Sequence, residues 1–209
     1  MTNLNQGPDL RGVIFDFGNV IYRFDLRRCT TELSRLCGLD SEEILRRVFD
    51  ESGLEWEYMA GNLDSSQFLA EASRLCGYPF EAEHFARTFS DIFTPIESTM
   101  TLVRHLKPGY KLGLISDTSE WHFERAIRLC PVYPLFDAVL LSYRERRLKP
   151  DRGLFESCLA QLNLRPEQCV FIDDRAANTA GARAMGLHAI TYQGHEALME
   201  SLRQLGIEV

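Results

Sequence analysis

Acidic residues follow two apolar segments that lie far apart in the chain. Asp16 comes directly after "GVIF", and the pair Asp173 and Asp174 follows "CVFI". Carboxylates gathered at one place repel each other unless a cation holds them. A divalent cation with oxygen ligands, Mg²⁺ above all, suits such a set. If the fold brings these acids together, the pattern therefore predicts a magnesium site.

Groups that can hold an anion follow other segments. Ser116 and Asp117 come at the end of "KLGLI", and Lys149 stands before a proline in a later loop. A hydroxyl, backbone N–H groups at the start of a helix and an ammonium group can bind the oxygens of a phosphoryl group. A carboxylate such as Asp16 can attack phosphorus as a nucleophile. Each residue alone also has an ordinary explanation as a cap, a turn residue or a surface charge.

The segments before these residues indicate the fold class. Apolar runs without alternation, which are typical of buried strands, cover 12–17, 110–116, 136–142, 169–174 and 188–192. Helical patterns over 120–130, 151–164 and 175–187 alternate with them. This order predicts an α/β fold, a Rossmann-like parallel sheet covered by helices on both faces. The carboxyl ends of such strands form the usual ligand site, which is where the residues above would meet.

The region between the first and second predicted strands is different in character. Residues 25–93 read as helical throughout, with amphipathic segments such as "RRCTTELSRLCGL" and "SEEILRRVFDESG". We therefore predict a small all-helical cap over 25–93, inserted after the first strand. The core would consist of residues 1–24 and 94–209.

Composition restricts the partners. The 209 residues carry a net charge of −7, and no basic run is present, which argues against nucleic acid. No stretch is apolar enough to span a membrane, and "MTNLNQGPDL" lacks the apolar region of a signal peptide. Six scattered cysteines favour reduced thiols in a cytoplasmic protein. The sequence leaves the oligomeric state, monomer or dimer, open.

Four motifs together resemble those of the haloacid dehalogenase-like hydrolase superfamily, which consists mostly of phosphatases. They are "FDFGNV" (15–20), "LISDTS" (114–119), Lys149 with Pro150, and "FIDDRAAN" (171–178). The helical insert is similar to the C1-type cap of that superfamily. The branch most similar contains bacterial α-D-glucose-1-phosphate phosphatase, in which Gly-Asn-Val also follows the nucleophile.

The resemblance implies a role for each motif residue. Asp16 would be the nucleophile that becomes an aspartyl phosphate. Ser116 and Lys149 would bind the phosphoryl group, with the backbone N–H of Asp117. The implied cofactor is Mg²⁺ and the implied partner a small phosphorylated substrate. The implied metal ligands are Asp16, the carbonyl of Gly18, Asp173 and Asp174.

Gly18 departs from the pattern of the superfamily. Most phosphatases of that group read Asp-x-Asp, and the second Asp serves as general acid and base, worth ~10²–10⁴ in rate. A good leaving group, as in a sugar 1-phosphate, reduces the need for a proton donor. Alternatively the cap segment 53–68 supplies an acid, with Glu55, Glu57 and Tyr58 as candidates. We expect Glu57 to contact the substrate.

Two other functions stay open at this stage. A 2-haloacid dehalogenase of the same superfamily is one, although it usually has an aromatic residue where Gly18 stands. The other is a catalytically weak regulatory protein that binds a phosphometabolite. The retained nucleophile Asp16 and the acidic pair favour the phosphatase.

Overall fold

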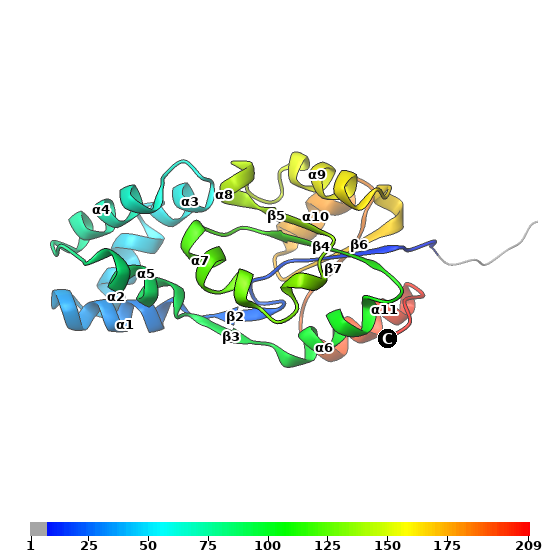
Figure 1. Ribbon diagram of the computed structural model, residues 1–209, viewed down its shortest axis with the longest axis horizontal. Coiled ribbons are helices and arrows are strands. Elements are labelled where there is room, and N and C mark those ends of the chain that lie inside the picture. Colours follow the sequence, from blue (N-terminus) through cyan, green and yellow to red (C-terminus); the bar gives the residue numbers. More distant parts are fainter. Residues whose placement is uncertain (1–7) are drawn as a thin grey trace, which may run out of the picture.

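A five-stranded parallel sheet forms the centre of the molecule. The computed structural model describes residues 8–209, so most of the segment used to judge a signal peptide lies outside the described residues. The strand order is β5-β4-β1-β6-β7, and Figure 1 shows the sheet with helices packed around it. The strands are β1 (Gly12–Phe15), β4 (Lys111–Ser116), β5 (Ala138–Leu141), β6 (Cys169–Asp173) and β7 (His188–Thr191). The predicted α/β fold with a parallel sheet is confirmed.

Alternate residues of the central strand enter two different apolar cores. Val13 and Phe15 belong to a cluster that includes residues of α6 (Glu97–Leu106) and α11 (His195–Gln204). Ile14 belongs to a cluster on the other face, with α9 (Arg152–Leu162) and α10 (Ala176–Ala184). All residues of β1 are buried, because both faces of the sheet are covered.

Short helices complete this part of the chain. They are α7 (Glu120–Arg125), the 3₁₀ turns η2 (Ile127–Leu129), η3 (Tyr133–Leu135) and η4 (Pro166–Gln168), and α8 (Ser142–Glu145). The single helix predicted over 120–130 is therefore interrupted at Ala126, whose backbone is not helical.

Helices between β1 and β4 surround a third apolar cluster. They are α1 (Leu26–Cys37), α2 (Ser41–Ile44), α3 (Leu54–Met59), α4 (Ser65–Cys76), α5 (Ala82–Ser90) and a π-helical stretch, η1 (Leu45–Asp50). Most of its buried members, such as Phe68 and Phe89, come from these helices, and Trp121 of α7 packs against it. We call this region the cap. The predicted division at residues 24/25 and 93/94 stays a prediction.

Two features of this region differ from the prediction. The helix predicted over "SEEILRRVFDESG" begins as α2 but continues as the π-helix η1. Strands β2 (Tyr22–Phe24) and β3 (Phe93–Pro95) pair antiparallel where the chain enters and leaves the cap. Figure 1 shows this small sheet between the cap helices and the main sheet.

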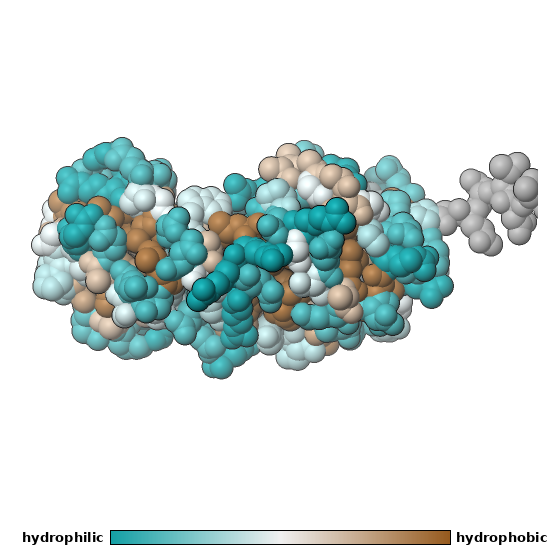
Figure 2. Space-filling model, turned by 90° about the horizontal axis from the view of Figure 1, so that it is seen from above, coloured by the Kyte–Doolittle hydropathy of each residue, from teal (hydrophilic) through white to brown (hydrophobic). Residues whose placement is uncertain are grey.

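The other bulk predictions concern cysteines and membranes. All six cysteines are free thiols, and Cys37 alone among them is not fully buried. Within residues 8–209, every helix is too short or too polar to cross a membrane. Figure 2 shows a mostly hydrophilic face, with apolar residues visible in the hollows between hydrophilic ones.

Candidate active site

The three acids predicted as metal ligands lie together at the carboxyl end of the sheet. Asp16 directly follows β1, Asp173 ends β6, and Asp174 comes next. These two strands are paired in parallel, so their ends lie side by side. One carboxylate oxygen from each residue lies within 4.8 Å of the others. Segments separated by about 155 positions thus build one acidic cluster.

Lys149 is buried among these acids. Its Nζ lies 2.6 Å from Asp16 Oδ1 and 2.8 Å from Asp173 Oδ2, and its side chain is 2% exposed. Burial lowers the pKa of Lys149, but the carboxylates of Asp16, Asp173 and Asp117 raise it above its ordinary value. For Asp16 the effect of burial has the opposite direction. Burial raises the pKa of this carboxyl, although the ammonium group of Lys149 acts to lower it. The ammonium group therefore stays charged and balances part of the acidic cluster.

Two asparagines hold the acidic pair in place. Asn178 Nδ2 donates to both oxygens of Asp173 at 3.0 Å, and Asn19 Nδ2 donates to Asp174 Oδ2 at 2.9 Å. Asn19 has a positive φ of 56°, which asparagine tolerates better than most residues. Arg175 N also donates to Asp173 Oδ1. The sequence reasoning assigned no role to either asparagine, although both lie inside quoted motifs.

Some oxygens of the cluster remain available. Asp16 Oδ1 accepts from Phe17 N at 2.7 Å, whereas Asp16 Oδ2 and Asp174 Oδ1 accept no hydrogen bond within residues 8–209. In the turn that follows, Tyr22 N donates to the carbonyl of Phe17 rather than to that of Gly18. Oxygen atoms that could ligate a cation therefore remain on Asp16, on Asp174 and at the carbonyl of Gly18 in the turn after β1.

A divalent cation fits this donor set. Three carboxylates gather here, and the one ammonium group contacts two of them, Asp16 and Asp173, which leaves an excess of negative charge. The donors are all oxygens, as Mg²⁺ prefers. Asp173 is already saturated by Lys149, Asn178 and Arg175 N. Asp16 and Asp174 are therefore better disposed to ligate an ion, with Asp173 positioning Lys149.

The loop after β4 contributes the predicted anion-binding groups. Ser116 is 3% exposed and ends the strand. Asp117 Oδ1 accepts from Lys149 N at 2.9 Å, while Asp117 Oδ2 is buried and has no hydrogen-bond partner among residues 8–209. Burial raises the pKa of Asp117. The side chain of Asp117 thus fixes the backbone of the lysine loop, a role that the sequence reasoning did not assign.

A cavity of about 60 Å³ lies between this loop and the cap. Glu55 and Met59 of α3 line it together with core residues that include Gly18, Ser116 and Asp117. A Cβ on Gly18 would lie 3.2 Å from the ring of Phe24. The phenyl ring of Phe24 therefore lies slightly closer to this position than an ordinary van der Waals contact.

Glu57 does not line this cavity. Its side chain is exposed and accepts a hydrogen bond from Asn62 Nδ2 at 2.7 Å. The cavity thus gives no support to the expected substrate contact of Glu57, because Glu55, two residues earlier on α3, lines it instead. Helical spacing alone could not show which glutamate of α3 faces the cavity, because each of them is followed by an aromatic residue.

His122 of α7 also lines the cavity. It is 4% exposed, stacks on Phe89 and donates from Nε2 to the carbonyl of Phe89 at 3.1 Å. Burial lowers its pKa to about 4. His122 is therefore a neutral packing residue between the core and the cap at neutral pH.

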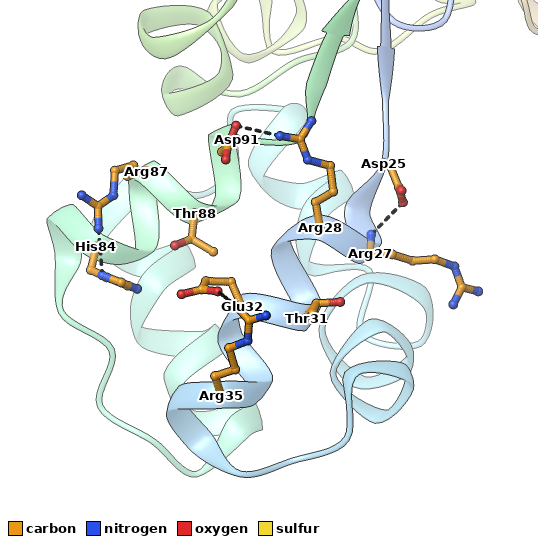
Figure 3. A pocket seen from close by; sticks show the side chains of 10 residues that line it. All are labelled: Asp25, Arg27, Arg28, Thr31, Glu32, Arg35, His84, Arg87, Thr88 and Asp91. Atoms are coloured by element: carbon orange, nitrogen blue, oxygen red, sulfur yellow. Dashed lines mark hydrogen bonds and ion pairs between the residues drawn. The ribbon is translucent and has the colours of Figure 1, made fainter.

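A larger cavity of about 540 Å³ lies elsewhere, on the surface of the cap. Figure 3 shows its residues on α1 and α5, with charged side chains that mostly pair with one another, such as Arg28 with Asp91. None of its lining residues belongs to the acidic cluster or to the loop after β4. The smaller cavity beside Gly18 is therefore the candidate active site.

The comparisons with known proteins agree with this geometry. The sequence pattern of the haloacid dehalogenase-like hydrolases matches residues 10–186. The chain therefore belongs to the haloacid dehalogenase-like hydrolase family.

Its relatives include enzymes and a larger protein. D-ribitol-5-phosphate phosphatase of Bacteroides thetaiotaomicron is 22% identical over 184 residues, which cover 85% of this chain and 89% of the relative. Acyl-CoA dehydrogenase family member 10 of Mus musculus is 27% identical over 161 residues, 74% of this chain. The match spans only 15% of that mouse protein.

Solved structures show the same fold. A predicted HAD-like family hydrolase from Porphyromonas gingivalis superposes with a TM-score of 0.81 at 24% identity, covering 96% of this chain and all of that one. A HAD family enzyme of Bacteroides thetaiotaomicron, in complex with magnesium and inorganic phosphate, gives a TM-score of 0.78 at 18% identity. That superposition covers 88% of this chain and 94% of the other.

Proposed function

We propose that the protein is a Mg²⁺-dependent phosphatase that hydrolyses a small phosphorylated metabolite through an aspartyl phosphate on Asp16. The observation that carries this proposal is the buried contact of Lys149 with Asp16, beside the acidic pair of β6. A regulatory protein that only binds a ligand needs no nucleophile held in such a cluster. The family membership and the relatives that are named phosphatases support the same activity.

The residues divide the work between them. Asp16 attacks the phosphorus atom with one of its carboxylate oxygens. Lys149 and Ser116 hold the phosphoryl oxygens beside it. Lys149 is kept in position by Asp173 and, through its backbone, by Asp117.

Mg²⁺ has ready ligands here. Asp16, Asp174 and the carbonyl of Gly18 would hold it, with Asp173 near by. A bound Mg²⁺ offsets the repulsion between the nucleophile and the incoming phosphate. The magnesium and phosphate found in the related Bacteroides structure support this assignment.

The resemblance to the glucose-1-phosphatase branch supports a sugar 1-phosphate as substrate. The relatives also include an enzyme named for ribitol 5-phosphate and one named hexitol phosphatase A. These names support the sugar phosphates and sugar-alcohol phosphates as the class to screen.

The test is phosphate release from p-nitrophenyl phosphate with Mg²⁺, in the wild type and in Asp16→Asn. We expect activity that EDTA removes and a loss of at least about 10³-fold in the variant, since an amide cannot act as the nucleophile. Persistent activity in Asp16→Asn contradicts the proposal. Chloride release from a 2-haloacid, with no phosphate release, would identify a dehalogenase instead.

A further inference from the structure

Gly18 leaves the proposed reaction without its usual proton donor. The departing alkoxide of an alkyl phosphate needs a proton, and the water that attacks the aspartyl phosphate must lose one. The cavity at Gly18 offers few groups that can do this. The ring of Phe24 lies beside Gly18, and His122 is neutral and already donates to Phe89.

Glu55 is the acid that the cap brings to this cavity. It lines the cavity together with Gly18 and Ser116. Its side chain is half-buried and makes no hydrogen bond or ion pair with any residue from 8 to 209. Most other buried or half-buried acids near the site have such a partner, as Asp16, Asp173 and Asp174 do. Glu55 is thus free to exchange a proton.

The helix that carries Glu55 is fixed to the core. Ser142 Oγ donates to the carbonyl of Met59, the last residue of α3, at 2.6 Å. The same hydroxyl accepts from Thr118 N at 2.8 Å, in the loop that follows Ser116. Trp121 N donates to the hydroxyl of Tyr58, also on α3. Glu55 is therefore held relative to the phosphate-binding loop with the rigidity that proton transfer requires.

We propose that Glu55 is the general acid and base of this enzyme, in place of the side chain missing at Gly18. The inference rests on the phosphatase proposed above. In the first step, Asp16 forms a bond to phosphorus while the bond to the leaving oxygen breaks and that oxygen takes the proton of Glu55. In the second step, the oxygen of a water molecule attacks phosphorus while the Glu55 carboxylate accepts a proton from that water. Phosphate leaves, and the Asp16 carboxylate and protonated Glu55 are restored.

The surroundings of Glu55 favour this dual role. Burial, together with the nearby carboxylate of Asp50 on η1, raises its pKa to about 7. From α1 the neutral thiol of Cys29 lies near it, and across the cavity lie Asp117 and neutral His122. No cation among the residues lining the cavity favours the charged form. Both protonation states are consequently accessible near neutral pH, as a group that first donates and then accepts needs.

The experiment compares leaving groups in Glu55→Gln and in the wild type, with Mg²⁺ present. For an alkyl phosphate such as glycerol 1-phosphate or ribitol 5-phosphate, we expect kcat/KM to fall by ~10²–10⁴. For p-nitrophenyl phosphate, whose leaving group needs no proton, we expect kcat/KM to fall by less than about tenfold. The wild-type kcat/KM for the alkyl phosphate should decrease above about pH 7, and this decrease should be absent in Glu55→Gln.

Glu57→Gln is the matched variant, because it makes the same change two residues further along α3, on an exposed side chain. We expect it to show no selective loss with the alkyl phosphate. Competitive inhibition by inorganic phosphate, measured in all three proteins, reports whether the phosphate site itself is intact. An unchanged inhibition constant in Glu55→Gln excludes a general distortion of the site.

The outcomes separate the two proposals. If kcat/KM in Glu55→Gln falls equally for both substrates, or for neither, the assignment of Glu55 is overturned while the phosphatase proposal stands. A wild type that hydrolyses the aryl phosphate and no alkyl phosphate also overturns it. Activity that survives Asp16→Asn, or a wild type inactive on every phosphate ester, refutes the phosphatase itself.

Discussion

A single ammonium group lies among several acids at the end of β1. Lys149 contacts Asp16 and Asp173 directly, and its backbone N–H donates to Asp117. Removing one partner of a buried ion pair leaves an uncompensated charge. Lys149 acts to lower the pKa of Asp16 against the effect of burial, and it holds the carboxylate in place. The arrangement of the acidic cluster therefore depends on Lys149.

His122 makes stability depend on pH in a defined window. In the unfolded chain it takes up a proton near the ordinary histidine pKa of 6.5, but burial lowers the pKa in the folded protein to about 4. Between pH 6.5 and pH 4 the unfolded chain binds a proton at His122 and the folded protein does not. The free energy of unfolding therefore decreases as the pH falls through this window. The shift corresponds to about 3 kcal/mol. Urea unfolding of the wild type and of His122→Asn at pH 7 and pH 4 measures this, because asparagine does not titrate.

We expect the wild type to lose about 3 kcal/mol more than the variant between the two pH values. Equal losses in both proteins would show that His122 is protonated in the fold or exposed. Absolute stability at pH 7 also falls in the variant, since the stacking on Phe89 is lost. Only the difference between the two pH values tests the titration.

Residue types and order predicted which residues lie together at this scale, but not the orientation of single side chains. Asp16, Ser116 and Lys149 could be placed at one end of the sheet because each follows a predicted strand or stands in a motif. Glu55 and Glu57 lie on one short helix, and their sequence context does not say which faces the core. Asn19 and Asn178 gave no signal of their own, because an amide that orients a carboxylate is indistinguishable in sequence from a turn or helix residue.

At the scale of elements, one hydroxyl connects α3, α8 and the loop after β4. Ser142 begins α8 and is fully buried, donating to Met59 O and accepting from Thr118 N. Ser142→Ala leaves that N–H without a partner, which costs about 1–3 kcal/mol in unfolding free energy. Urea unfolding measures this cost.

The same variant should also lower kcat, because α3 then loses its anchor beside the loop after β4. Ser142→Cys is the matched control, since it keeps the volume and a weak donor. We expect it to recover part of the stability. A cost below about 0.5 kcal/mol in Ser142→Ala would mean that solvent replaces the lost hydrogen bonds.

The five strands of the main sheet could be predicted because long apolar runs have one plausible place in an α/β fold. Strands β2 and β3 could not, since each has three residues and β3 ends in Pro95. The π-helix η1 was missed because its apolar residues, such as Val48 and Phe49, also fit an ordinary helical face. Short or irregular elements are decided by their tertiary contacts rather than by local pattern.

At the scale of the whole molecule, the cap and the core meet through a few close contacts. Gly61 follows α3 with a φ of +71°, and a Cβ there would overlap the carbonyl oxygen of Tyr143 in α8. Gly61→Ala should therefore cost about 1–2 kcal/mol for the backbone conformation, and a further ~1–3 kcal/mol for the displaced contact. Thermal or urea unfolding measures the sum.

Gly77→Ala is the control for this prediction. Gly77 has a similar φ of +64° at the end of α4, with open space around it. Gly77→Ala should show the cost of the backbone conformation without the cost of a displaced contact. Equal destabilisation of the two variants would mean that the cap moves away from Tyr143 without loss.

Trp56 on α3 lies against the guanidinium of Arg175, whose Cζ is 5.1 Å from the centre of the indole ring. Arg175 directly follows Asp174, so the aromatic ring of the cap touches the residue next to the acidic pair. The chain has only one other tryptophan, Trp121, which packs into the cluster inside the cap. The junction between the cap and the core thus carries an intrinsic fluorophore. Its emission should change when magnesium binds or when the cap moves away from the core, without any attached label.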